Sequence, residues 1–258
     1  MSTDLAAAAR SLLAAHHAGP PLLLANVWDA ASAAAVEAAG FGFVATSSRA
    51  VAAVLGVADD DSTDPDLVFD WLARICRAVS SPVTADLEAG FGLAPDELVD
   101  RLLAAGAVGC NLEDSDHHGS GGLVDADRQA AYLNAVRAAA ASAGVHVVVN
   151  ARVDAFIRAI GDEQETRDEV ARRGRLYLEA GADCVYPIAM SRLDQVDAAV
   201  ADIPGPVNAM ARPGGLSISD LAAHGVRRIS LASSLHHQVS DYLQGLLRDL
   251  AGPDEAAP

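Results

Sequence analysis

Short apolar runs alternate with alanine-rich stretches along almost the whole chain. Each run has the length and composition of a buried strand, and each intervening stretch has helical spacing. The predicted strands are 22–26, 43–46, 83–86, 108–112, 147–151, 184–188, 207–210 and 228–231. The clearest predicted helices are 30–39, 96–105, 126–142, 167–180 and 193–200. Strict alternation of strand and helix predicts an α/β fold with a parallel sheet.

One junction recurs, in which a helix end and a glycine precede an apolar strand: EAAGFGFVA, LAAGAVGCN, LEAGADCVY and AAHGVRRISL. Glycine at this place is typical of a helix C-terminal stop. Eight such units favour a closed (β/α)8 TIM barrel over an open doubly wound sheet, and no Gly-x-Gly-x-x-Gly follows the first strand. The Gly-rich stretch 119–123 lacks the Lys-Ser/Thr of a phosphate loop and is predicted to be a mobile loop.

The chain has 258 residues, a length that fits one barrel. We predict a single (β/α)8-barrel catalytic domain over residues 1–251 and a disordered polar tail over 252–258. Two connections, 47–64 and 113–125, are longer than is usual in a barrel and are predicted to be lids or binding loops.

The formal charge of −17, without any lysine, makes nucleic acid and anionic membranes improbable partners. The absence of lysine also excludes mechanisms that need a lysine Schiff base. An acidic protein that binds a small-molecule carboxylate must neutralise it locally, with a metal ion or a placed arginine. The N-terminus lacks a signal-peptide pattern and the three cysteines are scattered, so we expect a cytoplasmic protein with reduced cysteines.

Acidic residues collect where the predicted strands end, which is the active-site face of such barrels. Asp86 and Glu88 flank the end of the third strand, and Glu113 follows the fourth. Carboxylates without His or Cys suit Mg²⁺ or Mn²⁺ and not Zn²⁺. The alternative is that these acids cap helices or are solvated. Arg152, after the fifth strand, could grip a substrate carboxylate at two points, or pair with Glu113 or Asp154.

These residues and their order resemble the isocitrate lyase and phosphoenolpyruvate mutase (phosphonomutase) superfamily across nearly the whole chain. The resemblance is carried by NVWDAASAAAVEAAGF, ATSSRAVAAVLGVADDD, PVTADLEAGFG, GAVGCNLEDSD, VVNARVDAF, LEAGADCVYP, PVNAMA and GVRRISLASSL. It implies a metal held directly by Asp86, with Glu88, Glu113 and Asp59 binding through water or directly. It further implies that Ser47, the amides of Ser48 and Arg49, and Arg152 hold the substrate. Further substrate-binding candidates at strand ends are Trp28, Asp29 and Asn208.

The resemblance also implies an eighth helix exchanged between subunits, usually in a dimer of dimers, that is, a homotetramer. The segment 234–250, with an apolar stripe, is the candidate for that helix. The alternative is an ordinary last barrel helix that packs on its own subunit. His236 and His237 at its start are predicted to serve packing or an interface.

The loop after the fourth strand departs from its relatives. It reads EDSDHHGSGGLVD, without the Cys of the isocitrate-type lyases or the Lys and Asn of the mutases. His117 and His118 are candidate acid-base catalysts there, and the alternative is that they are merely solvated.

The resulting hypothesis is a metal-dependent carbon-carbon lyase. It would cleave a bond next to a 2-oxo or 2-hydroxy carboxylate through an enolate of pyruvate type, with oxaloacetate decarboxylation or hydrolysis as the example. The alternatives are a phosphonomutase-type enzyme, a metal-dependent aldolase and a non-catalytic metabolite-binding barrel.

Overall fold

Parallel strands form a closed barrel in the computed structural model, which describes residues 4–119 and 121–251. One ladder has the order β1-β9-β8 and the other runs from β2 to β7 in sequence order. Only Ala25 separates β1 from β2, and a parallel bridge from Val185 to Val207 connects β7 with β8, so the two ladders close on each other. The strands are β1 Leu22–Leu24, β2 Asn26–Val27, β3 Val44–Thr46, β4 Val83–Asp86, β5 Gly109–Glu113, β6 Val148–Val153, β7 Cys184–Pro187, β8 Asn208–Met210 and β9 Arg228–Ser230.

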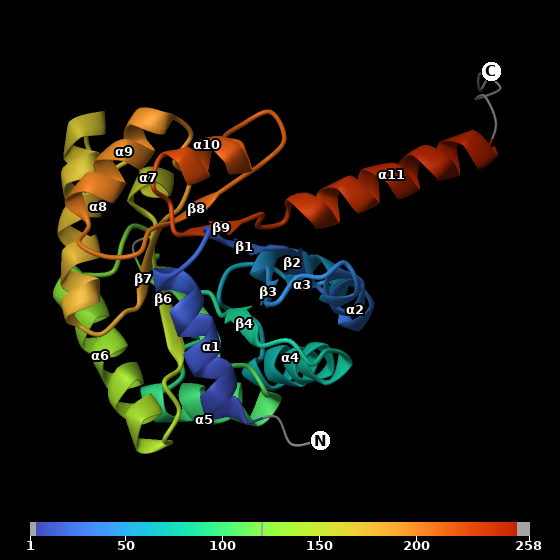
Figure 1. Ribbon diagram of the computed structural model, residues 1–258, viewed down its shortest axis with the longest axis horizontal. Coiled ribbons are helices and arrows are strands. Elements are labelled where there is room, and N and C mark those ends of the chain that lie inside the picture. Colours follow the sequence, from blue (N-terminus) through green and yellow to red (C-terminus); the bar gives the residue numbers. More distant parts are fainter. Residues whose placement is uncertain (1–3, 120, 252–258) are drawn as a thin grey trace.

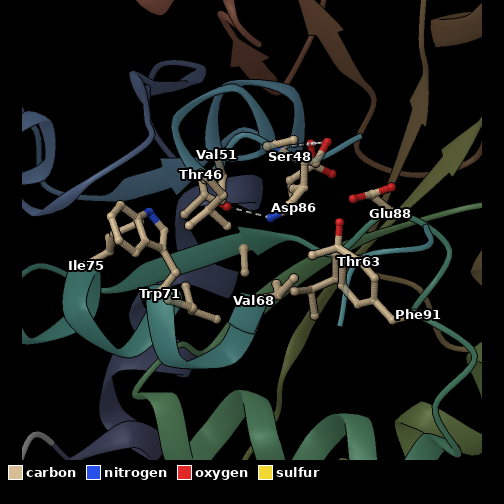
Figure 2. A pocket seen from close by; sticks show the side chains of 16 residues that line it. Thr46, Ser48, Val51, Thr63, Val68, Trp71, Ile75, Asp86, Glu88 and Phe91 are labelled. Carbon is tan, nitrogen blue, oxygen red and sulfur yellow. Dashed lines mark hydrogen bonds between the residues drawn. The ribbon is translucent and has the colours of Figure 1, made fainter. Parts of the chain in front are cut away.

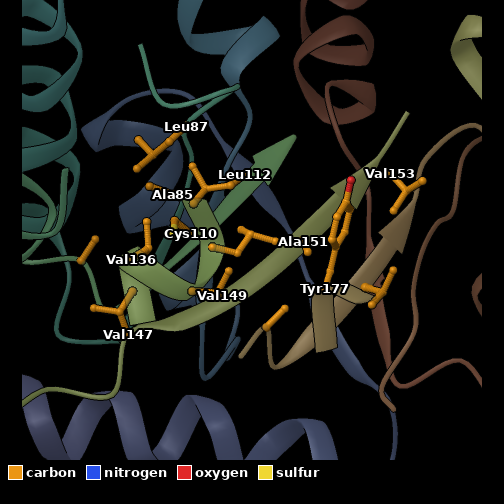
Figure 3. Close-up of a cluster of buried hydrophobic side chains, with 14 of the residues drawn as sticks. Ala85, Leu87, Cys110, Leu112, Val136, Val147, Val149, Ala151, Val153 and Tyr177 are labelled. Carbon is orange, nitrogen blue, oxygen red and sulfur yellow. The ribbon is translucent and has the colours of Figure 1, made fainter. Parts of the chain in front are cut away.

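Alternate residues of the strands face the helices and the barrel interior. The outward set, which includes Ala85, Cys110, Leu112, Val149 and Ala151, packs with helix side chains in the main core (Figure 3). Toward the carboxyl ends of the strands, the alternating inward set is polar. The register places Asp86 beside Asn111, Asn111 beside Asn150, and Glu113 beside Arg152. The same alternation that builds the core therefore brings the candidate site residues to the carboxyl end of the barrel.

Helices surround the barrel, and short loops connect them to the strands (Figure 1). They are α2 Ala30–Ala38, α3 Ser48–Leu55, α4 Pro65–Ala78, α5 Pro95–Ala105, α6 Ala126–Ser142, α7 Ala155–Arg158, α8 Glu163–Glu179, α9 Leu193–Asp202 and α10 Ile218–Ala223. None of the helices within the described residues has the length and apolar character needed to cross a membrane.

The first and last helices are placed differently from the others. Helix α1, Leu5–His17, covers the amino end of the barrel, where Leu12 joins a small core with residues such as Leu22 and Val148. Helix α11, Ser234–Ala251, extends away from the barrel (Figure 1) and has no buried residue. Its apolar side chains are exposed, among them Leu243 (53%) and Leu246 (43%).

The predicted α/β barrel is confirmed, and the predicted strand boundaries agree with the structure within one or two residues. Two details differ. The first predicted strand is divided into β1 and β2, and the connection 47–64, predicted as a long loop, contains α3. The predicted tail 252–258 lies outside the described residues, as does residue 120 of the predicted mobile loop.

A buried charge network fixes α8 to the end of β5. The carboxylate of Asp114, which is fully buried, accepts hydrogen bonds from Arg173 Nη1 at 3.0 Å, Tyr177 Oη at 2.8 Å and the Asp154 backbone N–H at 2.8 Å. Arg173 is also paired with Glu169 at 2.6 Å. Burial raises the pKa of Asp114, because desolvation outweighs these favourable contacts. The carboxylate is therefore costly to bury and depends on its partners.

We expect Asp114→Ala to reduce the free energy of unfolding by about 3–5 kcal/mol, because Arg173 and Tyr177 lose a buried acceptor. Asp70→Ala is the matched control, since Asp70 is an exposed helical aspartate. The measurement is chemical denaturation followed by circular dichroism. A loss below ~1 kcal/mol, the size expected of a surface ion pair, would contradict the assigned role of Asp114.

Candidate active site

Asp86 ends β4 and is held by the neighbouring strand and helix. Its Oδ2 accepts hydrogen bonds from the backbone N–H and the Oγ of Ser48, at 3.1 and 2.9 Å, and its Oδ1 accepts one from Asn111 Nδ2 at 3.3 Å. Its own N–H donates to Thr46 Oγ1 at 2.8 Å (Figure 2). Because Ser48 begins α3, the carboxylate lies at a helix N-terminus, where negative charge is stabilised.

Glu88 lies in a backbone conformation that non-glycine residues rarely adopt, with φ of 50°. Its Oε2 accepts a short hydrogen bond from the backbone N–H of Asp61, which also has a positive φ, of 60°. Asp61 Oδ1 in turn accepts from the N–H groups of Ala89 (3.0 Å) and Phe91 (2.8 Å). The two acids therefore lock the connection after β3 to the turn after β4.

The candidate metal ligands are close enough to influence one another. Burial raises the pKa of Glu88 to about 8, and the negative charges of Asp59, Asp86 and Glu113 raise it further. The hydrogen bond from the Asp61 backbone lowers it but does not cancel these effects. These four acids are the ones that the sequence analysis assigns to a metal. Burial and the neighbouring acids therefore favour the protonated form of Glu88 at the place where a cation was predicted.

Glu113 and Arg152 form a buried ion pair at the ends of β5 and β6. Arg152 also makes a two-point contact with Asp154, from Nε at 2.7 Å and Nη2 at 2.9 Å. Glu113 Oε1 lies 2.6 Å from His117 Nε2. Burial raises the pKa of Glu113, although the contact with His117 opposes this change, and the hydrogen bond to Glu113 raises the pKa of His117.

Two adjoining cavities lie among these side chains and share Arg49, Asp59, Arg152 and Ile157. The larger, about 340 Å³, is called the mouth cavity here. It is lined by Ser47, Ser48, Arg49, Asp59, Asp86, Arg152, Ile157, Ile188, Ala189, Met210, Arg212, Ala232, Ser233, Ser234 and His237. The smaller, the acidic cavity, is lined by Arg49, Asp59, Glu88, Glu113, Ser115, His117, Arg152, Asp154, Ile157 and Arg158.

Other predicted site residues do not line either cavity. The carboxylate of Asp29 accepts from Ser32 N at 2.7 Å and caps α2, while Trp28 makes an edge contact with His236 at 5.0 Å. Asn208 is fully buried inside the barrel. His118 is exposed and lies 3.1 Å from Asp61 Oδ2. Their roles toward a substrate stay predictions.

Several residues of the site were not predicted from the sequence. Asp61 organises the acid-bearing turn, Asn111 contacts Asp86, and Arg212 and His237 line the mouth cavity. His237, for which a packing or interface role was predicted, lines the cavity, and that role stays a prediction. The run of three acids ADDD was a usable signal for Asp61, whereas nothing in the local sequence marks Arg212.

The donor set fits Mg²⁺ in chemical type, because its members are carboxylates without His or Cys. In the described part of the chain, however, no three or more His, Cys, Asp or Glu side chains converge as a metal site would require. Glu113 is turned to Arg152 and His117, and Glu88 to the Asp61 backbone. The assignment of Asp86, Glu88, Glu113 and Asp59 as ligands therefore stays a prediction.

Curated relatives cover most of the chain. An uncharacterized protein of Mycobacterium tuberculosis is 33% identical over 219 residues, which are 84% of this chain and 80% of the relative. Phosphonopyruvate hydrolase of Variovorax is 32% identical, over 72% of this chain and 67% of the relative. Oxaloacetate decarboxylase of Bradyrhizobium is 27% identical, over 87% and 77%.

Solved structures agree with the fold. A provisionally assigned phosphonomutase of Burkholderia cenocepacia has a TM-score of 0.87 and 37% identity, covering 94% of this chain and 98% of its own. Phosphonopyruvate hydrolase in complex with oxalate and Mg²⁺ has a TM-score of 0.80 and 28% identity, covering 97% and 91%. The phosphoenolpyruvate phosphomutase family model matches residues 12–251. The chain therefore belongs to the phosphoenolpyruvate phosphomutase family.

Proposed function

We propose that this protein is a Mg²⁺- or Mn²⁺-dependent carbon-carbon lyase that cleaves a bond next to a 2-oxo carboxylate, with oxaloacetate as the leading substrate. The observation that carries the proposal is the gathering of Asp59, Asp86, Glu88, Glu113 and Arg152 around two adjoining cavities at the carboxyl end of the barrel. Names of relatives add support, since they include a decarboxylase of oxaloacetate and a hydrolase bound to oxalate and Mg²⁺.

Asp86 is the proposed principal metal ligand, with Glu88, Glu113 and Asp59 as direct or water-mediated ligands. A bound divalent cation would polarise the carbonyl and carboxylate oxygens of the substrate and stabilise negative charge on a pyruvate enolate. Ser48 donates two hydrogen bonds to Asp86 and so orients its carboxylate. Asn111 supports the other oxygen of that carboxylate.

The chain's own groups have distinct tasks in this mechanism. Ser47 and the Arg49 amide lie at the N-terminal end of α3, which suits the binding of a carboxylate, whereas the Ser48 amide already donates to Asp86. Arg152 is held rigidly by Asp154 and faces both cavities, so its charge is directed at the bound acid. His117 is the candidate that holds a proton in the acidic cavity, through its contact with Glu113.

Asp86→Asn should leave the protein folded and reduce kcat/KM for oxaloacetate by about 10³-fold or more, because the proposed metal loses its direct ligand. Titration calorimetry should show that Mg²⁺ binds the wild type and Asp70→Asn but not Asp86→Asn. Chelation should abolish turnover and added Mg²⁺ should restore it. An Asp86→Asn protein with full activity and unchanged Mg²⁺ affinity would overturn the assignment.

Isocitrate and methylisocitrate should be poor substrates, because the loop after β5 has no cysteine to donate a proton. Loss of a general acid typically costs about 10²- to 10⁴-fold in rate. In this loop His117 is engaged with Glu113 and His118 with Asp61, while Ser120 lies outside the described residues. The cysteines are in other elements, and burial raises the pKa of each to about 12.

The measurement is kcat/KM with Mg²⁺ for oxaloacetate, phosphonopyruvate, isocitrate and methylisocitrate. We expect oxaloacetate to be preferred, and phosphonopyruvate tests the phosphonate-cleaving alternative. Cleavage of isocitrate or methylisocitrate at ~10⁴ M⁻¹s⁻¹ or faster, within the range of ordinary enzymes, would show that another group donates the proton. A protein that binds these acids without turnover would instead be a metabolite-binding barrel.

We further propose that α11 packs against a second copy of this chain, within a dimer or a dimer of dimers. The helix extends from the barrel (Figure 1) and buries none of its own side chains. Its exposed apolar side chains are Val239, Tyr242, Leu243, Leu246, Leu247 and Leu250. An apolar stripe of this length is a typical interaction surface.

The double variant Leu243→Glu/Leu246→Glu should dissociate the oligomer, because it places charge in the proposed interface. Gln244→Glu, on the same helix, is the control and should keep the native mass. The measurement is light scattering at micromolar concentration. A wild-type protein that is monomeric under these conditions would exclude the proposed assembly.

A further inference from the structure

The mouth cavity carries a further positively charged side chain, Arg212, on the side away from the residues assigned to the metal and the 2-oxo acid. One side is formed by Ser47, Asp86 and their neighbours, and the other by the ends of β8 and β9, including Arg212. The proposed function uses only the first side. The second side is therefore available to the part of a substrate that extends beyond the 2-oxo carboxylate.

Arg212 is the arginine of this cavity whose charge has no partner among residues 4–119 and 121–251. Arg152 is paired with Glu113 and Asp154, and Arg49 lies 3.4 Å from Asp59. No ion pair or side-chain hydrogen bond joins Arg212 to any residue in these ranges, and the residue is exposed. An unpaired guanidinium that lines a cavity is suited to bind an anionic group, because its N–H groups can donate charge-assisted hydrogen bonds.

The turn after β8 fits the Arg212 side chain closely. The backbone N–H of Arg212 donates to the Leu216 carbonyl at 3.2 Å, and its carbonyl accepts from Gly215 at 3.1 Å. A Cβ at Gly215 would lie 2.7 Å from Arg212 Cγ and 2.8 Å from its Nε. Glycine at this place therefore leaves the space that the arginine side chain occupies. The turn holds the side chain beside the cavity and limits the conformations that it must lose on binding.

We propose that Arg212 binds a second anionic group of the substrate, a carboxylate or phosphonate on the carbon next to the 2-oxo group. The site would then select dianionic acids over monoanionic ones. This inference rests on the proposed function, because it takes the Asp86 side of the cavity as the place of the 2-oxo carboxylate. The charge balance supports it: the acids near Asp86 repel a second negative charge unless a cation such as Arg212 neutralises it.

Arg212 is a specificity residue in this scheme, and direct binding tests it without turnover. Titration calorimetry with Mg²⁺ present compares malate, each enantiomer separately, with lactate, which lacks the second carboxylate. The wild type should bind one malate enantiomer at least about tenfold more tightly than lactate, the effect of one charge-assisted contact. Arg212→Gln should remove that preference and leave lactate and oxalate affinities within about twofold.

Two further variants separate the effect of the position of the Arg212 side chain from the effect of its positive charge. Gly215→Ala keeps every charge but displaces the Arg212 side chain, so it should weaken malate binding in the same direction as Arg212→Gln. Arg10→Gln removes one positive charge from an exposed position on α1 and should change nothing. A wild type without preference for malate over lactate, or an Arg212→Gln protein that keeps the preference, would overturn the inference.

Steady-state kinetics distinguish the inference from the proposed function. Arg212→Gln should raise KM about tenfold to a hundredfold for oxaloacetate, and for phosphonopyruvate if the phosphonate is the group bound, with little change in kcat. If the wild type turns over neither acid and still prefers malate, the proposed lyase activity fails and the anion site stands. If it turns over oxaloacetate and Arg212→Gln does so with the same KM, the anion site fails and the activity stands.

Discussion

The carboxyl end of the barrel depends on the buried cation of Arg152. Desolvation alone would lower the pKa of Arg152, but attraction to Glu113 and Asp154 raises it above its usual value. Removing this charge would leave the buried carboxylate of Asp154 without an ion pair and Glu113 with His117 alone, at a cost of about 3–5 kcal/mol. Asp154 also accepts from Ser115 Oγ at 2.5 Å, and its N–H donates to Asp114. One ion pair therefore connects the loop after β5, the end of β6 and the network on α8.

The interior below this layer is polar, whereas many barrels fill it with branched apolar side chains. Asn111 Oδ1 accepts from Asn150 Nδ2 at 2.8 Å and from Arg228 Nη2 at 3.1 Å, which leaves its Nδ2 to donate to Asp86. Arg228 is fully buried and forms no ion pair with the described residues. Its positive charge lies under the acids of the mouth and offsets part of their repulsion.

The strands were predictable because buried parallel strands are short, almost continuous apolar runs bounded by glycine and polar residues. Helix α3 was not, because it has only eight residues and no side-chain cap at Ser47, and Asp86, 38 positions away, supplies the acceptor at its N-terminus. The acids at strand ends could be named from the sequence, but their partners could not. Arg212 shows the limit most clearly, since the role proposed for it rests on the absence of an ionic partner among the described residues and on the space beside Gly215.

Strain in the acid-bearing turn has a consequence for binding. Positive φ angles at Asp61, Glu88 and Phe91 each cost on the order of 1–3 kcal/mol, and such residues persist only where their surroundings hold them. Here the carboxylates themselves hold the turn, since Glu88 accepts from Asp61 N–H and Asp61 accepts from Ala89 and Phe91. The position of the Glu88 backbone is thus set before any ligand arrives. In the proposed metal site, the acid side chains would exchange a protein partner for the cation while this backbone keeps its position.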